Sequence, residues 1–127
     1  MTCELQVQGM SNNIDISVGF AGLKLSNPVF TASGTCGYAD ELDDFMDVNC
    51  LGGFITKSIT LKPRKGNAPP RIVETDSGML NAIGWANIGL DKFIEEKLPV
   101  IRKMSPAVFV NIAGETIADY VAVVERL

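Results

Sequence analysis

The sequence contains no histidine, few cysteines and no long apolar run, and each shortage narrows the functions that it can support. Without histidine, the usual general base near neutral pH is missing, so a base within this stretch has to be a cysteine, a lysine or a carboxylate. The three cysteines, Cys3, Cys36 and Cys50, are widely spaced and form no CxxC pair. That pattern excludes a zinc set and fits reduced thiols, so we expect no metal site in this chain.

Charge and hydropathy exclude two classes of partner. The net charge is -4, and the basic residues are nowhere denser than in Lys62-Pro63-Arg64-Lys65, so we expect no binding to nucleic acid or to anionic lipid. No apolar run approaches the ~20 residues that cross a bilayer. The amino terminus also lacks the basic and apolar regions of a signal peptide. We therefore expect a cytoplasmic protein without a membrane segment.

What the sequence does contain is three apolar segments that each run into a small polar cluster. The clusters are Ala32-Ser33-Gly34-Thr35, Thr56-Lys57-Ser58 and Asn111-Ile112-Ala113-Gly114. We predict buried strands over 29–32, 52–56 and 107–113. Because carboxyl ends of parallel strands converge on one face, a lysine, hydroxyls, an amide and glycines would line one cavity. Such a cavity suits a large anionic cofactor.

Helical patterns follow the predicted strands. Apolar spacing predicts helices over 40–48, over 91–101 with Asp91 as cap, and from Thr116 onwards, while Pro99 is expected to end or kink the second. Alternation within 14–25 predicts a small hairpin that caps the body. Strand and helix alternation predicts an α/β fold, a parallel sheet flanked by helices. Three such units leave a sheet edge open, so we expect an incomplete domain, most simply part of a barrel of typically ~250 residues.

The segment from Ile59 to Gly89 is rich in proline and glycine and has little periodicity. Long segments of this kind are typically lids or binding loops, so we expect it to fold over the site, with a short hairpin of its own. Within it, Asn81-Ala82-Ile83-Gly84 either forms a simple turn or offers an amide and a close-approach glycine to a ligand. Trp85 either covers that ligand or belongs to a small core of the loop.

Lys57 and Asn111 each have more than one possible role, and the chemistry of the side chain limits which roles are available. Lys57 can contact an anion, form a Schiff base or act as a base of lowered pKa. We favour anion contact, because Ser58 and two strand-end glycines suit the close approach of a phosphate or a flat ring. Asn111 is costly to bury unless it is paired, either with a ligand or with the protein.

Five motifs, in this order and spacing, resemble the dihydroorotate dehydrogenase family, with the closest match to the catalytic subunit of the NAD-linked, B-type class 1 enzymes. The resemblance covers nearly the whole chain after Ile14, and its motifs are Asn27-Pro28-Val29 through Ala32-Ser33-Gly34, Gly52-Gly53-Phe54-Ile55-Thr56-Lys57-Ser58, Pro70-Arg71-Ile72-Val73-Glu74-Thr75, Gly78-Met79-Leu80-Asn81-Ala82-Ile83-Gly84 and Asn111-Ile112-Ala113-Gly114.

The resemblance implies an eight-stranded (β/α)8 TIM barrel that holds FMN and oxidises dihydroorotate to orotate in pyrimidine biosynthesis. Residues 1–127 would be the amino-terminal portion of that single domain, with a hairpin and about the first three strand-helix units. The FMN contacts that the resemblance implies are Ala32, Ser33, Gly34, Lys57, Ser58 and Asn111. The substrate contacts that it implies are Lys57, Asn81, Ala82, Ile83, Gly84 and Trp85.

Class 1 members use a cysteine base in a Ser-Cys-Pro-Asn motif, which is absent here and expected beyond Leu127. The resemblance also implies a partner subunit that carries FAD and a 2Fe-2S cluster and relays electrons to NAD, and a homodimer of catalytic subunits within a heterotetramer. Two departures stand in the loop, with Trp85 where leucine is usual and Ile88 where proline is usual. The competing hypotheses are an aldolase-like Schiff-base barrel that uses Lys57, and a truncated fragment without catalysis.

Overall fold

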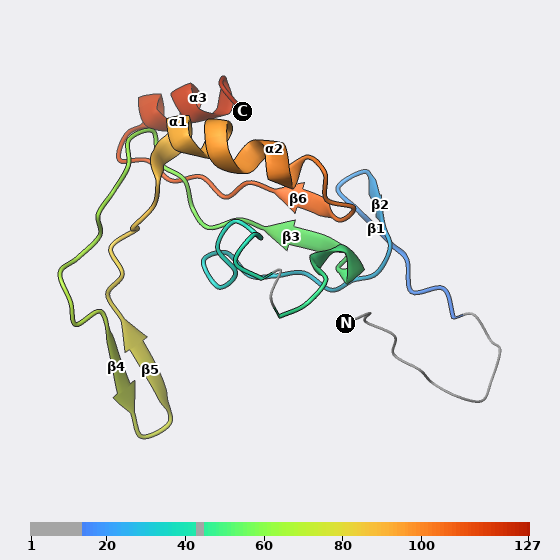
Figure 1. The fold of residues 1–127 in the computed structure, drawn as a ribbon, viewed down its shortest axis with the longest axis horizontal. Helices are drawn as coiled ribbons and strands as arrows, with labels where there is room; N and C mark the ends of the chain where they lie inside the picture. Colours follow the sequence, from blue (N-terminus) through green and yellow to red (C-terminus); the bar gives the residue numbers. More distant parts are fainter. Residues whose placement is uncertain (1–13, 43–44) are drawn as a thin grey trace. The chain divides into compact units, whose positions relative to one another are not determined.

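The computed structural model describes residues 14–42 and 45–127, which form two compact units (Figure 1). The first unit comprises the described residues up to Lys57 together with Pro99–Asn111. The second comprises Ser58–Leu98 and Ile112–Leu127. The irregular segment predicted before Ile14 lies outside the described residues. Within the described part of the chain, no helix has the length and apolar character needed to cross a membrane.

The first unit begins with the predicted hairpin. Strands β1 (Val18–Phe20) and β2 (Leu23–Leu25) pair antiparallel through a two-residue turn at Ala21 and Gly22. Both turn residues have positive φ, 48° and 80°, as the two-residue turns of tight hairpins require. Phe20 then packs edge-on against Phe30 and Phe109, with ring centroids 5.8 Å apart in both pairs. The hairpin therefore caps the body of this unit, as predicted.

Two of the three predicted strands form a parallel pair. Strand β3 (Gly53–Ile55) runs beside β6 (Ala107–Phe109), with Phe54 opposite Val108. Figure 1 shows the two arrows pointing the same way. The buried cluster of this unit consists of Ala39, Leu51 and Phe54, with Met104 and Val108 among the residues packed against it. Burying the apolar β3 against β6 thus fixes the register that places both carboxyl ends together.

The strand predicted over 29–32 is wrong as a strand. Only Phe30 forms a bridge to Gly53, and it is parallel. The Thr31 hydroxyl accepts a hydrogen bond from Ile55 N at 2.9 Å and donates one to Ile55 O at 3.3 Å. Because this side chain occupies both backbone groups of Ile55, the backbone ladder does not continue. The segment nevertheless runs parallel beside β3, so its polar end lies near that of β3.

The described residues of the helix predicted over 40–48 form no α-helix. Residues 43 and 44 lie outside the described residues, and the described ones form turns up to a 3-10 helix, η1 (Val48–Cys50). Phe45, expected on the buried face, is 82% exposed. A helix this short depends on burial of its apolar face, and in this structure Phe45 buries none.

In the second unit, one helical segment runs as α1 (Gly89–Lys92), a π-helical turn (Phe93–Lys97) and α2 (Leu98–Ile101), the last crossing into the first unit. The helix starts two residues before the predicted cap Asp91, because the Asn87 side chain accepts from Gly89 N at 2.9 Å. Before Pro99, the Leu98 N–H bonds to Phe93 O. The proline is accommodated by a wider turn instead of ending the helix.

The rest of the second unit follows the predictions. Helix α3 (Ile117–Val124) starts at a capping box formed by Thr116 and Asp119. The long segment contains the expected hairpin, β4 (Ile72–Thr75) and β5 (Gly78–Asn81), whose residues are all exposed. Ile59 and Ile112 form a parallel bridge. The fully buried side chains of this unit are Ile59, Leu90, Phe93 and Val123.

Candidate functional site

Three polar residues meet at the carboxyl ends of the parallel segments in the first unit. The Asn111 side-chain amide donates to Ser33 Oγ at 2.6 Å, and Ser33 Oγ donates to Thr56 O at 3.0 Å. Asn111 N donates to Thr56 Oγ1 at 3.1 Å. The contacts join residues 78 and 55 positions apart in the sequence. The structure therefore brings Ser33 and Asn111 together, as the strand-end argument predicts.

Thr56 is the centre of this network and is fully buried, with 0% exposure. Its N–H extends the β3–β6 pairing by donating to Phe109 O at 3.0 Å, and its hydroxyl donates to Lys57 O at 3.1 Å. The hydroxyl thus donates one hydrogen bond and accepts another within the protein, which is the usual state of a buried polar group. Thr56 therefore has a structural role, because it fixes the positions of Ser33 and Asn111.

Lys57 follows Thr56 directly and is half-buried. Its N–H donates to Gly37 O at 2.8 Å, which fixes the backbone at the end of β3. Among residues 14–42 and 45–127, no carboxylate lies within salt-bridge distance of its ammonium. A half-buried cation with no carboxylate partner in the described part of the chain is suited to an anionic ligand.

The FMN contacts predicted at the end of the segment 29–32 are exposed. Ala32, Ser33 and Gly34 all lie at the surface of the described chain. Gly34 has φ of 80°, and a Cβ built there meets nothing within 4 Å. The space beside Gly34 is therefore open, and the positive φ favours glycine over any other residue.

The other predicted contacts, Ser58 and the segment 81–85, belong to the second unit. The segment is fixed by Asn67, whose N–H donates to Ile83 O at 3.1 Å and whose side chain donates to Ala82 O at 2.9 Å. A Cβ at Gly84 would lie 2.8 Å from Asn67 N, so this glycine is required for the close approach of two backbone segments. Asn67 thus holds the backbone of the segment 81–85 in place.

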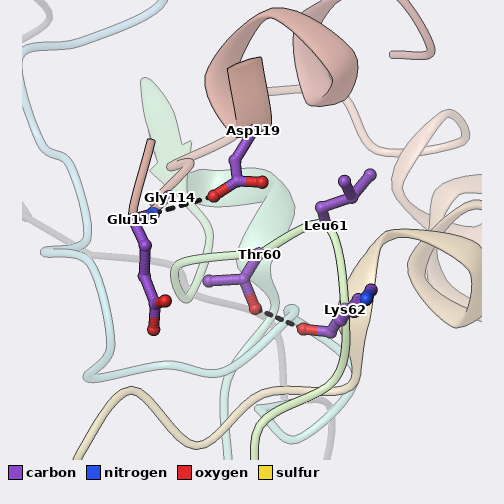
Figure 2. Close-up of a pocket in the computed structure, with 6 residues that line it drawn as sticks. All are labelled: Thr60, Leu61, Lys62, Gly114, Glu115 and Asp119. Atoms are coloured by element: carbon purple, nitrogen blue, oxygen red, sulfur yellow. Dashed lines mark hydrogen bonds between the residues drawn. The ribbon is translucent and has the colours of Figure 1, made fainter. Parts of the chain in front are cut away.

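A pocket of ≈ 240 Å³ lies in the second unit (Figure 2). Its lining residues are Thr60, Leu61, Lys62, Gly114, Glu115 and Asp119. Figure 2 shows that two of its polar groups are already occupied, because Asp119 accepts from Glu115 N at 3.0 Å and Thr60 donates to Lys62 O at 2.6 Å. Gly114, from the third of the predicted strand-end clusters, lines this pocket, whereas none of the residues predicted to contact FMN or the substrate does.

The Asp119 carboxylate has a lowered pKa. Backbone N–H groups of Thr116 and then of Glu115 donate to it, and these hydrogen bonds hold its pKa below 3.8. The charged form is therefore the one that caps α3, and this contribution to stability is present at neutral pH and lost as the pH falls through that lowered pKa. The lowered pKa of Asp119 is therefore explained by its role in the capping box at the start of α3.

Sequence reasoning named Thr56 only as a member of a strand-end cluster, and it did not single out three residues of the second unit, Arg64, Asn87 and Glu115. A local signal for Asn87 was present, since an asparagine side chain commonly bonds the backbone two residues further on, as Asn87 does with Gly89 N. Arg64 and Glu115 form an ion pair of 2.6 Å across 51 positions of sequence, which no local pattern indicates. Within the described ranges, no group of three metal-ligating side chains is present.

Comparison with protein families gives a match that spans most of the chain. The family model described as dihydroorotate dehydrogenase matches residues 15–127. The catalytic subunit of dihydroorotate dehydrogenase B (NAD(+)) from Citrifermentans bemidjiense is 52% identical over 113 residues, which cover 89% of this chain and 37% of that protein. The protein of the same name from Thermoanaerobacter sp. is 50% identical over 115 residues, covering 91% and 37%. The chain therefore spans 37% of the length of these curated relatives.

Solved structures give the same result for the fold. A crystal structure of DHODH from Eimeria tenella in complex with ferulenol matches with a TM-score of 0.70 at 23% identity, covering 99% of this chain and 36% of that one. The ligand-free type from the same organism matches with a TM-score of 0.67 at 25% identity, over 99% and 37%. The α/β arrangement of the chain is therefore that of the corresponding part of these enzymes.

Proposed function

The chain belongs to the dihydroorotate dehydrogenase family, and we propose that the complete protein uses FMN to oxidise dihydroorotate to orotate in pyrimidine biosynthesis. The observation that carries this proposal is the network of Ser33, Thr56 and Asn111 beside Lys57 at adjacent strand ends. In the proposed site, the network would supply an amide and a hydroxyl, and Lys57, the residue after Thr56, would supply a cation. Those are the groups that a planar heterocycle with polar edges and an anionic reduced form requires.

The donor set fits FMN. Ala32, Ser33 and Gly34 would lie along the flavin, and the open space beside Gly34 supports the close approach of a flat ring. Asn111 would hydrogen-bond a polar edge of the ring, while Ser33 holds the amide in place through the 2.6 Å contact. Ser58 would be a further contact. When bound, FMN supplies a two-electron acceptor for the hydride of the substrate.

Lys57 would serve both ligands. The dihydroorotate carboxylate is an anion, and the flavin gains negative charge when hydride arrives, so one cation stabilises the bound substrate and the charge that develops during transfer. The segment 81–85 would hold the substrate ring through its amide, backbone groups and Trp85. The oxidation also needs a base to take the proton from the carbon next to the ring carbonyl. No histidine is present in the chain, and we propose that a cysteine in the rest of the protein has this role.

The larger assembly follows from the same proposal. The chain would supply the amino-terminal part of an eight-stranded barrel, about three strand-helix units as the family resemblance implies, and the fold match to the Eimeria tenella enzyme supports the α/β class. Its relatives are named catalytic subunits of NAD-linked enzymes, so we propose a partner subunit with FAD and a 2Fe-2S cluster that passes electrons to NAD. Two catalytic subunits would pair within a heterotetramer in the cytoplasm.

The test is anaerobic reduction of the complete protein by dihydroorotate. We expect FMN to be released on denaturation, and we expect dihydroorotate to bleach the flavin absorbance with one orotate formed per flavin. Dihydrouracil has the same ring without the carboxylate and is the matched control, because it cannot pair with Lys57. It should reduce the flavin far more slowly. A colourless protein, or a flavin that dihydroorotate does not reduce, contradicts the proposal. Borohydride trapping of a substrate adduct on Lys57 would instead support the Schiff-base alternative.

Asn111→Ala should weaken the binding of FMN by about tenfold, because one hydrogen bond to the ring is lost, a loss of about 1.4 kcal/mol. The dissociation constant is measured by titrating flavin-free complete protein with FMN. Asn49→Ala is the matched control, since Asn49 lies in the same unit and its side-chain carbonyl accepts from Ser105 N at 2.9 Å, away from the strand ends. An unchanged dissociation constant in the Asn111 variant would show that the amide has only a structural role.

A further inference from the structure

The backbone at Gly84 and Trp85 has an unusual conformation. Both residues have positive φ, 73° and 56°, in succession. Glycine adopts this region freely, whereas a bulky side chain rarely does and needs surrounding contacts to hold it there. The conformation of the backbone at Gly84 and Trp85 therefore depends on the contacts that hold Trp85. That conformation determines the orientation of the backbone groups in the segment 81–85.

Two residues hold Trp85 from opposite ends. The Asn87 side chain donates to Trp85 O at 2.7 Å, and the Arg64 guanidinium lies over the indole ring with Cζ 5.4 Å from the ring centroid. Arg64 and Asn87 are also paired with each other through two backbone hydrogen bonds of 3.0 Å. The carbonyl and the ring of Trp85 are thus anchored to one rigid pair of residues.

Asn87 is itself fixed. Its carbonyl oxygen accepts from Gly89 N at 2.9 Å and from Thr60 N at 3.3 Å, and its amide donates to Thr60 Oγ1 at 2.9 Å. Thr60 is buried. Asn87 therefore acts as a structural support for the helix start as well as for Trp85, and it is a poor choice for a test of function.

Arg64 has a more specific role, because its guanidinium also forms an ion pair with Glu115. Arg64 Nη1 lies 2.6 Å from Glu115 Oε1, and Glu115 comes four positions after Asn111 in the sequence. An exposed ion pair alone contributes little to stability. Here the pair orients a guanidinium that lies over an aromatic ring, and lysine, with a compact ammonium on a flexible stem, cannot reproduce that arrangement.

We propose that Arg64, oriented by Glu115, is a positioning residue for the substrate: it holds Trp85 in its left-handed conformation and so presets the loop 81–85 for dihydroorotate. The inference rests on the proposed function, in which that loop binds the substrate. Its consequence is specific. Losing Arg64 should weaken substrate binding without changing the chemical step or the flavin, because Arg64 touches neither.

The experiment is a double-mutant cycle on the complete, flavin-loaded protein with Arg64→Leu, Trp85→Leu and the double variant. Arg64→Leu should raise KM for dihydroorotate about fivefold, with kcat and the flavin spectrum close to those of the unchanged protein. In the Trp85→Leu background, the same change should raise KM by less than about twofold, because the ring that Arg64 holds is gone. Arg64→Lys should fall between, and Arg102→Leu, which removes an exposed arginine in the first unit, should change nothing.

Hydrogen exchange by mass spectrometry gives a readout that does not depend on turnover. Peptides covering 81–87 should exchange about fivefold faster in Arg64→Leu than in Arg102→Leu. Unchanged exchange overturns the inference, as does faster exchange with an unchanged KM, or additive effects in the cycle. If dihydroorotate fails to reduce the unchanged protein, the proposed function falls and takes the substrate role of Arg64 with it. If the unchanged protein is active and only the Arg64 results fail, the proposed function stands.

Discussion

Replacing Lys57 with alanine in the complete protein is expected to slow reduction of the flavin by dihydroorotate by about 10²–10³-fold, the usual cost of removing one preorganised electrostatic contact. The reason is that Lys57 stands at the end of β3 as a half-buried cation with no salt-bridge partner in the described residues. It would contribute to substrate binding and to the stabilisation of developing negative charge. The rate is measured by anaerobic stopped-flow absorbance at saturating substrate.

Lys24→Ala is the matched control for this experiment. Lys24 is an exposed lysine of β2 in the same unit, so its removal changes the net charge equally without touching the strand ends. The control should reduce within twofold of the unchanged protein. If Lys57→Ala retained flavin and reduced at the control rate, the assignment of Lys57 to both ligands would be wrong.

Replacing Gly52 with alanine is expected to destabilise the complete protein by about 3 kcal/mol, at the upper end of what overpacking costs. A Cβ at this position would lie 1.7 Å from the backbone oxygen of Asn27, and backbone cannot move aside as a flexible side chain can. Gly52 N also donates to Val29 O at 3.0 Å. The overpacking would therefore occur where the segment 29–32 contacts the start of β3. The thermal unfolding midpoint and the flavin content should both fall.

Gly19→Ala provides the comparison. A Cβ at Gly19 meets no atom within 4 Å, and the residue lies on β1 of the same unit. This change should alter the free energy of unfolding by no more than about 0.5 kcal/mol. Equal unfolding midpoints for the two variants would mean that the close approach of Asn27 and Gly52 does not exist in the folded protein.

The candidate site was predictable from the sequence to the extent that it follows from strand ends. Ser33 and Asn111 come directly after apolar segments, and parallel pairing brings such positions together, as the 2.6 Å contact confirms. That Thr56 would link them was not predictable. Which hydroxyl bonds which amide depends on the register of β3 against β6, and the register is set by packing across the sheet.

Two failures have a common cause in burial. The apolar spacing within 40–48 is real, but Phe45 is 82% exposed and the described residues of this segment form no α-helix, since spacing alone does not supply the surface that a helix packs against. Trp85 presents the opposite case. Its left-handed backbone contradicts local preference and is held by contacts from two residues. Arg64 is distant from Trp85 in the sequence, whereas Asn87 is close to it. Tertiary contacts override propensity in both places.

The measurement that tests the central claim most directly is a crystal structure of the complete protein with its bound cofactor. The account predicts that the Lys57 ammonium and the Asn111 amide both lie within about 3.2 Å of polar atoms of the flavin ring, and that the ring passes beside Gly34. A flavin bound elsewhere, with Lys57 more than about 6 Å from it, would contradict the account.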